Sequence, residues 1–214
     1  MTNEIVYIGD PMCSWCWGFA SVIDSIHKDF NHEAPLSIIL GGLHAYDDFP
    51  MSKDYKNDIR HHWEDVNRAT GAVFDYRFFD RDGFILDTEP ACRAVVTIRK
   101  IKPDFVLSFY ESISRSFYSE NKDTTVLKTF KPLIKQVGID FEEFDQKFNS
   151  SQIKEETKSD FQFSKKIGVT GFPTVLVKEG ERLALLTAGY QPYQTLKPAI
   201  EDWLKNGLSD HPRD

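Results

Sequence analysis

Residues 5–16, Ile-Val-Tyr-Ile-Gly-Asp-Pro-Met-Cys-Ser-Trp-Cys, carry the pattern that decides the fold. The apolar, mostly β-branched run at its start is typical of a buried strand, and the Gly-Asp-Pro turn ends that strand. Two cysteines then stand three positions apart at the start of an amphipathic helix, which apolar spacing predicts over about residues 14–30. A second apolar run at Leu36–Leu40 predicts the next strand. The first 42 residues therefore predict a β-α-β unit.

Residues 43–150 have a different character, because helical periodicity replaces strand-like runs. The spacing of apolar residues, with capping and breaking residues, predicts helices over about 52–69, 88–102, 103–117, 126–137 and 140–148. Pro132 lies inside the fourth helix, where it predicts a kink. This stretch is expected to form an all-helical inserted subdomain.

The last third of the chain predicts an α-β-β-α unit. A polar helix is expected from residue 151 to Ile167, followed by a hairpin with strands at 174–178 and 183–187 and by a final helix around Trp203. Joined to the first unit, this order is the thioredoxin arrangement of an α/β protein. We therefore predict a thioredoxin-like domain from residues 1–42 and 151–214, interrupted by the helical insertion at 43–150.

Charge and hydropathy exclude several classes of function. The chain has 214 residues, with 26 basic and 33 acidic side chains and a net charge of -7, and no basic block suggests binding to nucleic acid or to anionic membranes. The first residues, Met-Thr-Asn-Glu, lack the basic segment of a signal peptide, and no later stretch is long and apolar enough to span a bilayer. These features predict a cytoplasmic protein.

Cys13 and Cys16 form the pair on which a functional role would depend, because three cysteines cannot build a disulfide framework. Their spacing places both on one helix face, one turn apart. The positive end of the helix would stabilise a Cys13 thiolate, with a pKa of about 3.5–7.5 in such motifs, although Asp10 would oppose this shift if it pointed at the sulfur. We expect an exposed Cys13 to attack a disulfide and the deeper Cys16 to resolve the mixed disulfide.

Other readings of these residues are weaker. A zinc site needs four ligands, and Cys92, His44, His61 and His62 show no paired ligand spacing, so no metal and no other cofactor is predicted. The adjacent histidines are expected on a solvated helix face. Cys92 is expected in the core, with a role as a third redox thiol left open.

A second cluster strengthens the assignment and carries a family resemblance. Residues 168–174, Gly-Val-Thr-Gly-Phe-Pro-Thr, place Pro173 at the entry to a strand. Together with residues 10–19, the Gly-Gly-Leu at 41–43 and the long insert, this cluster resembles the DsbA-like branch of the thioredoxin superfamily, and more narrowly bacterial proteins described as predicted protein-disulfide isomerases. The resemblance implies that Pro173 is a cis-proline beside the cysteines and that Phe172 offers its backbone to an extended substrate.

The motif departs from that of the periplasmic oxidase at its third position. Trp15 stands where that enzyme has a histidine that supports a strongly oxidising thiolate, so the redox direction is left open. Trp15 is also expected to face substrate, together with Phe172.

These observations predict a thiol–disulfide oxidoreductase or isomerase acting on protein or small-molecule disulfides and thiols, with glutathione as a candidate partner. Kappa-class glutathione transferases and 2-hydroxychromene-2-carboxylate isomerases resemble the same architecture, but typically carry serine at the reactive position. A chaperone-like peptide binder that uses the cleft between the subdomains is a third alternative.

Overall fold

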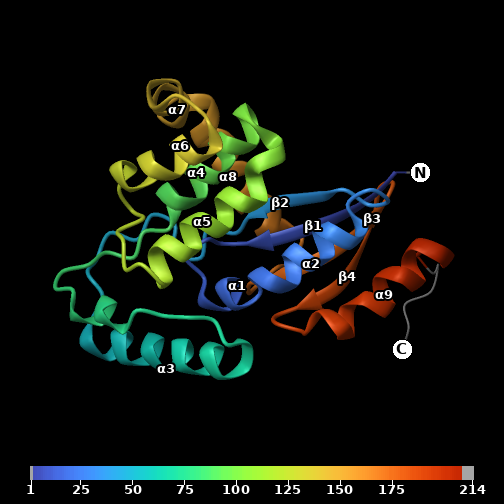
Figure 1. The fold of residues 1–214 in the computed structure, drawn as a ribbon, viewed down its shortest axis with the longest axis horizontal. Helices are drawn as coiled ribbons and strands as arrows, with labels where there is room; N and C mark the ends of the chain where they lie inside the picture. The colour runs from blue at the N-terminus through green and yellow to red at the C-terminus, as the bar shows by residue number, and fades with distance from the viewer. Residues whose placement is uncertain (1, 209–214) are drawn as a thin grey trace.

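The computed structural model describes residues 2–208, which contain one mixed sheet (Figure 1). Its strands are β1 (Asn3–Gly9), β2 (Leu36–Leu40), β3 (Thr174–Glu179) and β4 (Arg182–Ala188), in the order β2-β1-β3-β4. β1 runs parallel to β2, whereas β3 is antiparallel to both β1 and β4. The two ends of the chain therefore share one sheet, as the predicted thioredoxin fold requires.

The helices follow the predicted order. Those of the described residues are α1 (Ser14–Gly18), α2 (Ala20–Phe30), α3 (Lys53–Thr70), α4 (Glu89–Ile101), α5 (Val106–Tyr118), α6 (Lys131–Val137), α7 (Phe141–Phe148), α8 (Ser151–Lys166) and α9 (Tyr193–Asn206). Short 3-10 helices lie at η1 (Tyr76–Asp80), η2 (Pro103–Phe105) and η3 (Leu127–Phe130). The predicted helical insertion is thus present, while its division from the rest at residues 42/43 and 150/151 stays a prediction.

Two helices differ from the prediction in instructive ways. The helix expected over 14–30 is interrupted at Phe19, where α1 ends and α2 begins. Gly18, just before the break, lies so close to α3 that a Cβ would stand 2.7 Å from Val66. Pro132 does not kink a helix, because η3 ends before it and the proline occupies the first turn of α6, where its missing N–H leaves no helical hydrogen bond unmade.

The two faces of the sheet bury different residues, because successive side chains of a strand point in opposite directions. Ile5 and Tyr7 of β1 point into the main core with Val175 and Val177 of β3, on the side where α2 and α9 pack. Val6, Ile8 and Leu176 form a separate small cluster on the opposite face. Figure 1 shows α8 behind this second face, where it contacts β2 and α4.

The outer edge of β2 is closed by an ion pair between two helices. Arg99 of α4 and Asp160 of α8 meet through two contacts of 2.7 and 3.0 Å. Arg99 also donates to the carbonyl of Ile38 (2.8 Å), and Asp160 accepts from the N–H of Leu40 (3.0 Å). The pair therefore satisfies backbone groups that an open edge strand would leave unpaired.

Helix α3 stands apart from α4–α8 and lies beside α1 (Figure 1). Its buried Trp63, 1% exposed, contacts rings of η1 and of α5, including Phe78 and Tyr118. Helix α3, which belongs to the insertion, therefore packs against α1. Within residues 2–208, no helix combines the length and apolar character needed to cross a membrane.

Candidate functional site

The two cysteines of the motif lie at the start of α1, as predicted. Cys13 is the N-cap residue, with extended φ and ψ of -95° and 122°, and its N–H donates to the Asp10 carbonyl at 3.0 Å. Cys16 lies one turn further along. Both are free thiols, and they are 5% and 1% exposed. Cys16 is the deeper of the two, but the expectation that Cys13 is exposed is wrong, because neighbouring side chains enclose it.

Phe172 and Pro173 complete the site from the other end of the chain. The peptide bond between them is cis, as the resemblance implied. The carbonyl of Phe172 accepts a hydrogen bond from the Cys13 thiol, with a sulfur–oxygen distance of 3.6 Å. Residues 159 positions apart therefore meet at the reactive sulfur.

The position of Phe172 depends on a glycine at the end of β2. A Cβ built on Gly41 would lie 2.0 Å from the ring of Phe172, a distance that no side chain tolerates. The sequence marks Gly41 only as the end of a strand. In the structure, the ring of Phe172 occupies the space that a side chain at residue 41 would fill.

Asp10 is a fully buried carboxylate that connects three segments. One oxygen accepts from the N–H of Met12 (2.8 Å) and the other from the N–H of Leu43 (2.7 Å). The second oxygen also accepts from the thiol of Cys92 on α4, at 3.4 Å. Cys92 is 0% exposed, so its assignment to the core is confirmed. The sequence treats Asp10 as a turn residue near a cysteine, and nothing local indicates that Cys92 faces it.

The surroundings of Cys13 raise the pKa of its thiol well above the ordinary value. The largest cause is the hydrogen bond with the Cys16 thiol, followed by burial, and Asp10 adds a smaller effect in the same direction; only the backbone N–H of Cys16 lowers the pKa. This is the reverse of the direction that the helix start predicts. Burial removes the water that would solvate a thiolate, so its cost outweighs the favourable N–H group.

Two tyrosine hydroxyls lie beneath the cysteine pair. The hydroxyl of Tyr7 lies 3.3 Å from the hydroxyl of Tyr110 on α5, and Cys16 is among the groups that act on its pKa. Burial raises the pKa of both tyrosines well above the ordinary value. Gly9 leaves the room for them, since a Cβ there would stand 2.7 Å from the Tyr110 oxygen. The sequence predicts Tyr7 only as a core residue of the strand.

A pocket of about 230 Å³ opens beside Cys13. Trp15 and Phe172 both line it, and their contact with substrate stays a prediction. Trp17 has another role, because its ring stacks on Tyr118 and its indole N–H donates to the carbonyl of Val73 at 3.1 Å. It anchors the end of α1 to the insertion.

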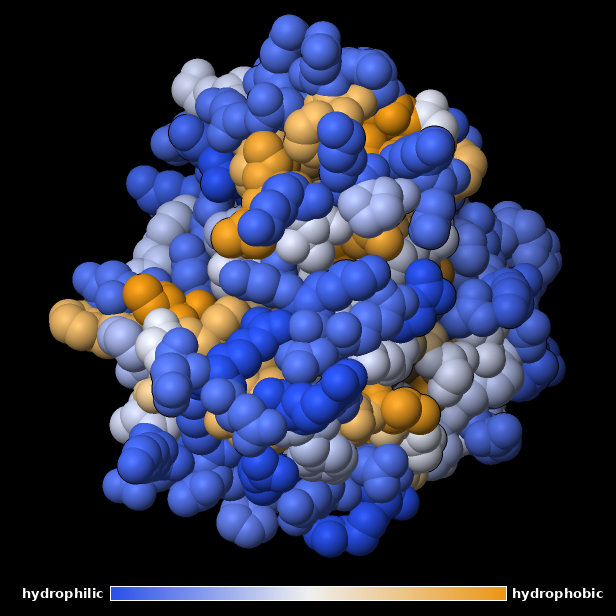
Figure 2. Space-filling model, turned by 60° about the vertical axis from the view of Figure 1, so that its left-hand side comes forward, coloured by the Kyte–Doolittle hydropathy of each residue, from blue (hydrophilic) through white to orange (hydrophobic). Residues whose placement is uncertain are grey.

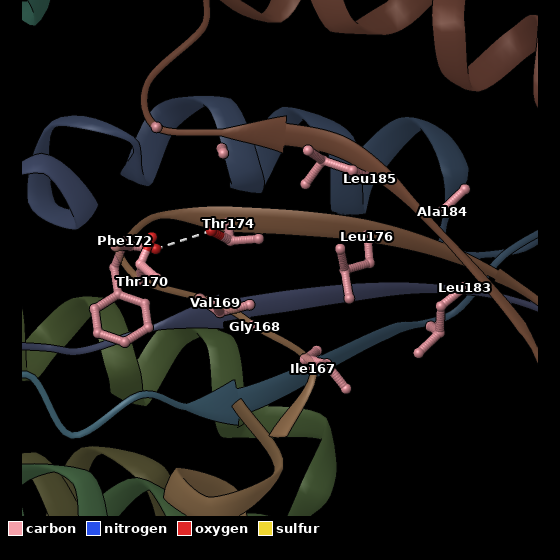
Figure 3. Close-up of a pocket in the computed structure, with 13 residues that line it drawn as sticks. Ile167, Gly168, Val169, Thr170, Phe172, Thr174, Leu176, Leu183, Ala184 and Leu185 are labelled. Carbon is pink, nitrogen blue, oxygen red and sulfur yellow. Dashed lines mark hydrogen bonds between the residues drawn. The ribbon is translucent and has the colours of Figure 1, made fainter. Parts of the chain in front are cut away.

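A larger groove of about 570 Å³ lies on the second face of the sheet (Figure 3). Figure 3 shows Phe172 at one end of this groove and Leu176, Leu183 and Leu185 along its strands. Gly171 and Phe172 line both cavities. The ring of Phe172 therefore separates this groove from the pocket beside Cys13.

Two of the histidines considered as ligands, His44 and His62, line the pocket beside Cys13. His61, next to His62 on α3, is exposed and does not line it. His44 is held by Asp47 and Tyr55 through its two ring nitrogens. Across residues 2–208, no group of three or more histidine, cysteine or acidic side chains is placed to hold a metal ion.

Three features define a thioredoxin-fold protein with a dithiol centre: a mixed sheet in the order β2-β1-β3-β4, a Cys-x-x-Cys pair at the start of α1, and a cis Phe172–Pro173 bond whose Phe172 carbonyl meets the first sulfur. A family model described as a DSBA-like thioredoxin domain matches residues 4–201. The chain belongs to this family of disulfide oxidoreductases and isomerases.

Known structures and one curated protein resemble the chain over most of its length. A proposed protein disulfide isomerase from Nitrosomonas europaea is 36% identical, with a TM-score of 0.91 and coverage of 96% of this chain and 98% of that one. The cytosolic disulfide reductase DsbM from Pseudomonas aeruginosa is 20% identical, with a TM-score of 0.76 and coverage of 94% and 98%; it has also been solved with GSH. The ClpXP adapter protein SpxH from Halalkalibacterium halodurans is 20% identical over 94% of this chain and 67% of its own length.

Proposed function

We propose that this protein is a cytoplasmic thiol–disulfide oxidoreductase or isomerase that exchanges disulfides through Cys13 and Cys16. The observation that carries the proposal is the position of the two sulfurs. Cys13 lines the pocket of about 230 Å³, whereas Cys16 stands one turn further along α1 and does not line it. The first thiol can reach a substrate, while the second can reach only the first.

Reduction of a substrate disulfide proceeds in two exchanges. The Cys13 thiolate attacks one substrate sulfur, the substrate S–S bond breaks, and the other substrate sulfur leaves as a thiolate that takes up a proton. Cys16 then loses its proton and attacks the Cys13 sulfur. The second substrate thiol is released, and two electrons have passed from the enzyme dithiol to the substrate. A thiol reductant such as glutathione restores the dithiol, and the same steps reversed oxidise a substrate dithiol.

The environment of Cys13 favours the reducing direction. A disulfide centre is strongly oxidising when its reduced form, with a low-pKa thiolate, is stabilised. Here hydrogen bonding to the Cys16 thiol and burial raise the pKa of Cys13. A disfavoured thiolate makes the dithiol the better electron donor, and the similar DsbM from Pseudomonas aeruginosa is itself named a disulfide reductase.

Phe172 is proposed to align the substrate, beside the cis bond to Pro173. Its carbonyl lies 3.6 Å from the Cys13 sulfur, so an extended segment that hydrogen-bonds to this backbone would hold its cysteine next to the attacking thiol. Trp15 forms the neighbouring wall of the pocket.

The test is insulin reduction by the wild type and by Cys13→Ser, Cys16→Ser and Cys92→Ser variants, with glutathione as the reductant. We expect loss of turnover in the first variant, a trapped mixed disulfide on Cys13 in the second, seen by mass spectrometry, and retained turnover in the third. Circular dichroism checks that each variant folds. Insulin reduction that persists in Cys13→Ser would overturn the proposal.

Glutathione transfer is a second candidate, favoured by the similar structure solved with GSH. A conjugation assay with glutathione and an aromatic electrophile separates it from disulfide exchange. We expect no conjugation above the uncatalysed rate, because Cys13 and Cys16 stand where transferases of this architecture typically have serine. A variant without either cysteine that still suppressed aggregation of an unfolded protein would instead favour the chaperone-like alternative.

A further inference from the structure

We propose that His44 is a further catalytic residue, which donates a proton to the substrate sulfur that leaves when Cys13 attacks a disulfide. Asp47 and Tyr55 are the positioning residues that orient its ring. This inference rests on the proposed function and adds a proton donor to it. It follows from the hydrogen bonds of the imidazole, from its place in the pocket and from the chemistry of the leaving sulfur.

Both ring nitrogens of His44 have partners, which fix the orientation of the ring. Nδ1 lies 3.1 Å from a carboxylate oxygen of Asp47, and Nε2 lies 2.8 Å from the hydroxyl of Tyr55. An ionised carboxylate can only accept, so Nδ1 carries a hydrogen. Burial, with the charges of Asp47 and Asp58, raises the pKa of Tyr55, so its hydroxyl keeps its proton. This hydroxyl donates to Nε2 of the neutral ring and accepts from Nε2–H of the protonated ring. The arrangement therefore suits both states of the imidazole.

The backbone of His44 is fixed as well. Its N–H donates to the hydroxyl of Thr88 at 3.2 Å, and its carbonyl accepts from the N–H of Thr88 at 3.4 Å, just before α4. The ring of Tyr55 on α3 lies edge-on to the imidazole, with the two centroids 5.8 Å apart. Contacts from two helices thus hold this side chain, as a catalytic group requires.

His44 lines the same pocket as Cys13 but comes from the loop after β2. In thiol–disulfide exchange the leaving sulfur departs on the side away from the attacking sulfur, so its proton donor has to border the pocket without bonding to Cys13. The Cys13 thiol donates to the carbonyl of Phe172 and leaves the imidazole to its own partners. Among the described residues that line the pocket, the remaining titratable side chains are His62 and Tyr118, and none is lysine or arginine.

Protonated His44 supplies the proton that the leaving sulfur takes up. The Cys13 thiolate forms a bond to one substrate sulfur, the substrate S–S bond breaks, and its electron pair goes to the other sulfur. That sulfur takes the proton from Nε2 and leaves as a thiol, while His44 becomes neutral and regains a proton from water. The side chains of His44 and Asp47 are 22% and 50% exposed, and hydrophilic groups cover much of the surface seen in Figure 2, so water can return this proton. The attack by Cys16 releases the second substrate sulfur into the same pocket, where the same donor serves it.

The test compares disulfides whose leaving thiols differ in acidity. Pre-reduced protein reacts in a single turnover with dithiobis(nitrobenzoate), which releases an aryl thiolate, or with hydroxyethyl disulfide, which releases an alkyl thiolate. A thiol of low pKa leaves readily as the anion, so only the alkyl disulfide needs a proton donor. We expect His44→Gln to slow the reaction with the alkyl disulfide by about a hundredfold and to leave that with the aryl disulfide within about twofold. Rapid acid quenching and mass spectrometry measure both rates.

Variants of the two ring partners and of a control histidine locate the effect. Asp47→Asn and Tyr55→Phe each remove one partner of the ring and should slow the alkyl disulfide selectively, by less than His44→Gln does. His61→Gln makes the same change at an exposed position of α3 that does not line the pocket, and should keep the wild-type rates with both disulfides. Thermal unfolding checks that each variant folds.

The outcomes separate this role from a structural one and from the proposed function. Equal slowing of both disulfides in His44→Gln, or unchanged rates with both, would overturn the role of His44 while the dependence on Cys13 remained. Exchange that survives Cys13→Ser would instead overturn the proposed function itself.

Discussion

The position of Cys13 at the start of a helix and its surroundings in the folded protein have opposite effects on the pKa of its thiol. The helix start predicts a lowered pKa, but the hydrogen bond with Cys16, burial and Asp10 raise it. The carboxylate of Asp10 accepts from Met12, the residue just before Cys13. Substitution of Asp10 therefore tests how a nearby negative charge affects the pKa of the Cys13 thiol.

Replacing Asp10 by asparagine should lower the pKa of Cys13, because the like charge that disfavours its thiolate is removed. The measurement is thiolate absorbance at 240 nm against pH in the reduced proteins, where the transition should move to lower pH. The amide nitrogen cannot accept from Leu43, so we also expect a loss of about 1–3 kcal/mol of stability. Adding Cys13→Ser to Asp10→Asn is the control and should abolish the shifted transition. A transition that stays in place or moves to higher pH would contradict this account.

At the scale of elements, two contacts show how helices position the sheet and the site. The Arg99–Asp160 pair closes the outer edge of β2, and its side chains are 28% and 9% exposed. Nearby, Lys100 of α4 pairs with Glu156 of α8 at 3.0 Å, with exposures of 47% and 33%. The two pairs join the same helices but differ in burial and in backbone contacts.

We expect Asp160→Ala to destabilise the protein by about 3–5 kcal/mol, because it leaves a partly buried guanidinium and the N–H of Leu40 without their acceptor. Lys100→Ala, which breaks the more exposed pair, should cost less than about 1 kcal/mol. Urea unfolding of both variants measures the difference. Similar losses of stability in the two variants would show that the contact of Asp160 with the backbone of β2 adds no stability beyond that of an exposed ion pair.

The raised pKa of Glu111 on α5 predicts that the stability of the protein depends on pH. Burial, with help from Asp24, raises the pKa of Glu111 to about 7 from its usual 4.5, against the opposing effect of Lys28 and Arg115. The folded state then binds the proton more tightly than the unfolded state. This contribution to stability is full below about pH 4.5 and is lost as the pH rises to about 7.

As the pH rises from about 4.5 to about 7, the Glu111→Gln variant should therefore become more stable relative to the wild type. The difference in the free energy of unfolding should reach about 1–3 kcal/mol at pH 8. Urea unfolding at pH 5 and pH 8 gives the comparison, and the other titrating groups cancel between the two proteins. Parallel pH profiles for the wild type and the variant would exclude this role for Glu111.

At the scale of the whole molecule, the insertion completes the site through α3. Trp63 is the buried residue that ties α3 to η1 and α5, and its ring lies 4.7 Å from that of Phe79 and 5.1 Å from that of Tyr118. Ile59 and His62 of the same helix line the pocket beside Cys13. The position of α3 therefore determines the shape of the pocket, although α3 contributes no cysteine to the disulfide exchange.

Trp63→Ala should cost about 3–5 kcal/mol, because it removes a large buried ring and leaves a cavity. Hydrogen exchange measured by mass spectrometry should show faster exchange in α3 than in the wild type, with little change in α9. His61→Ala, an exposed neighbour on α3, should stay within about 0.5 kcal/mol of the wild type. Unchanged protection of α3 in Trp63→Ala would mean that other contacts hold the helix.

Local patterns in the amino-acid sequence predict the order of strands and helices, the dithiol motif at the start of α1 and the family resemblance that places Pro173 beside it. These features are readable because they depend on local patterns: apolar periodicity, turn residues and the spacing of Cys13 and Cys16 along one helix. The departures at Phe19 and Pro132 are small shifts in where helices begin and end.

The enclosure of the site, in contrast, follows from contacts between distant segments. The burial of Cys13, the contact of Asp10 with Cys92, the hydroxyl of Tyr7 at Cys16 and the space that Gly41 leaves for Phe172 all join residues that local patterns cannot relate. Each depends on how close two distant segments pack, and burial adds to the effect of Cys16 in raising the pKa of Cys13, against the direction that the helix start predicts. The sequence thus identified the reactive pair, while packing set the acidity of its first thiol and built the pocket beside it.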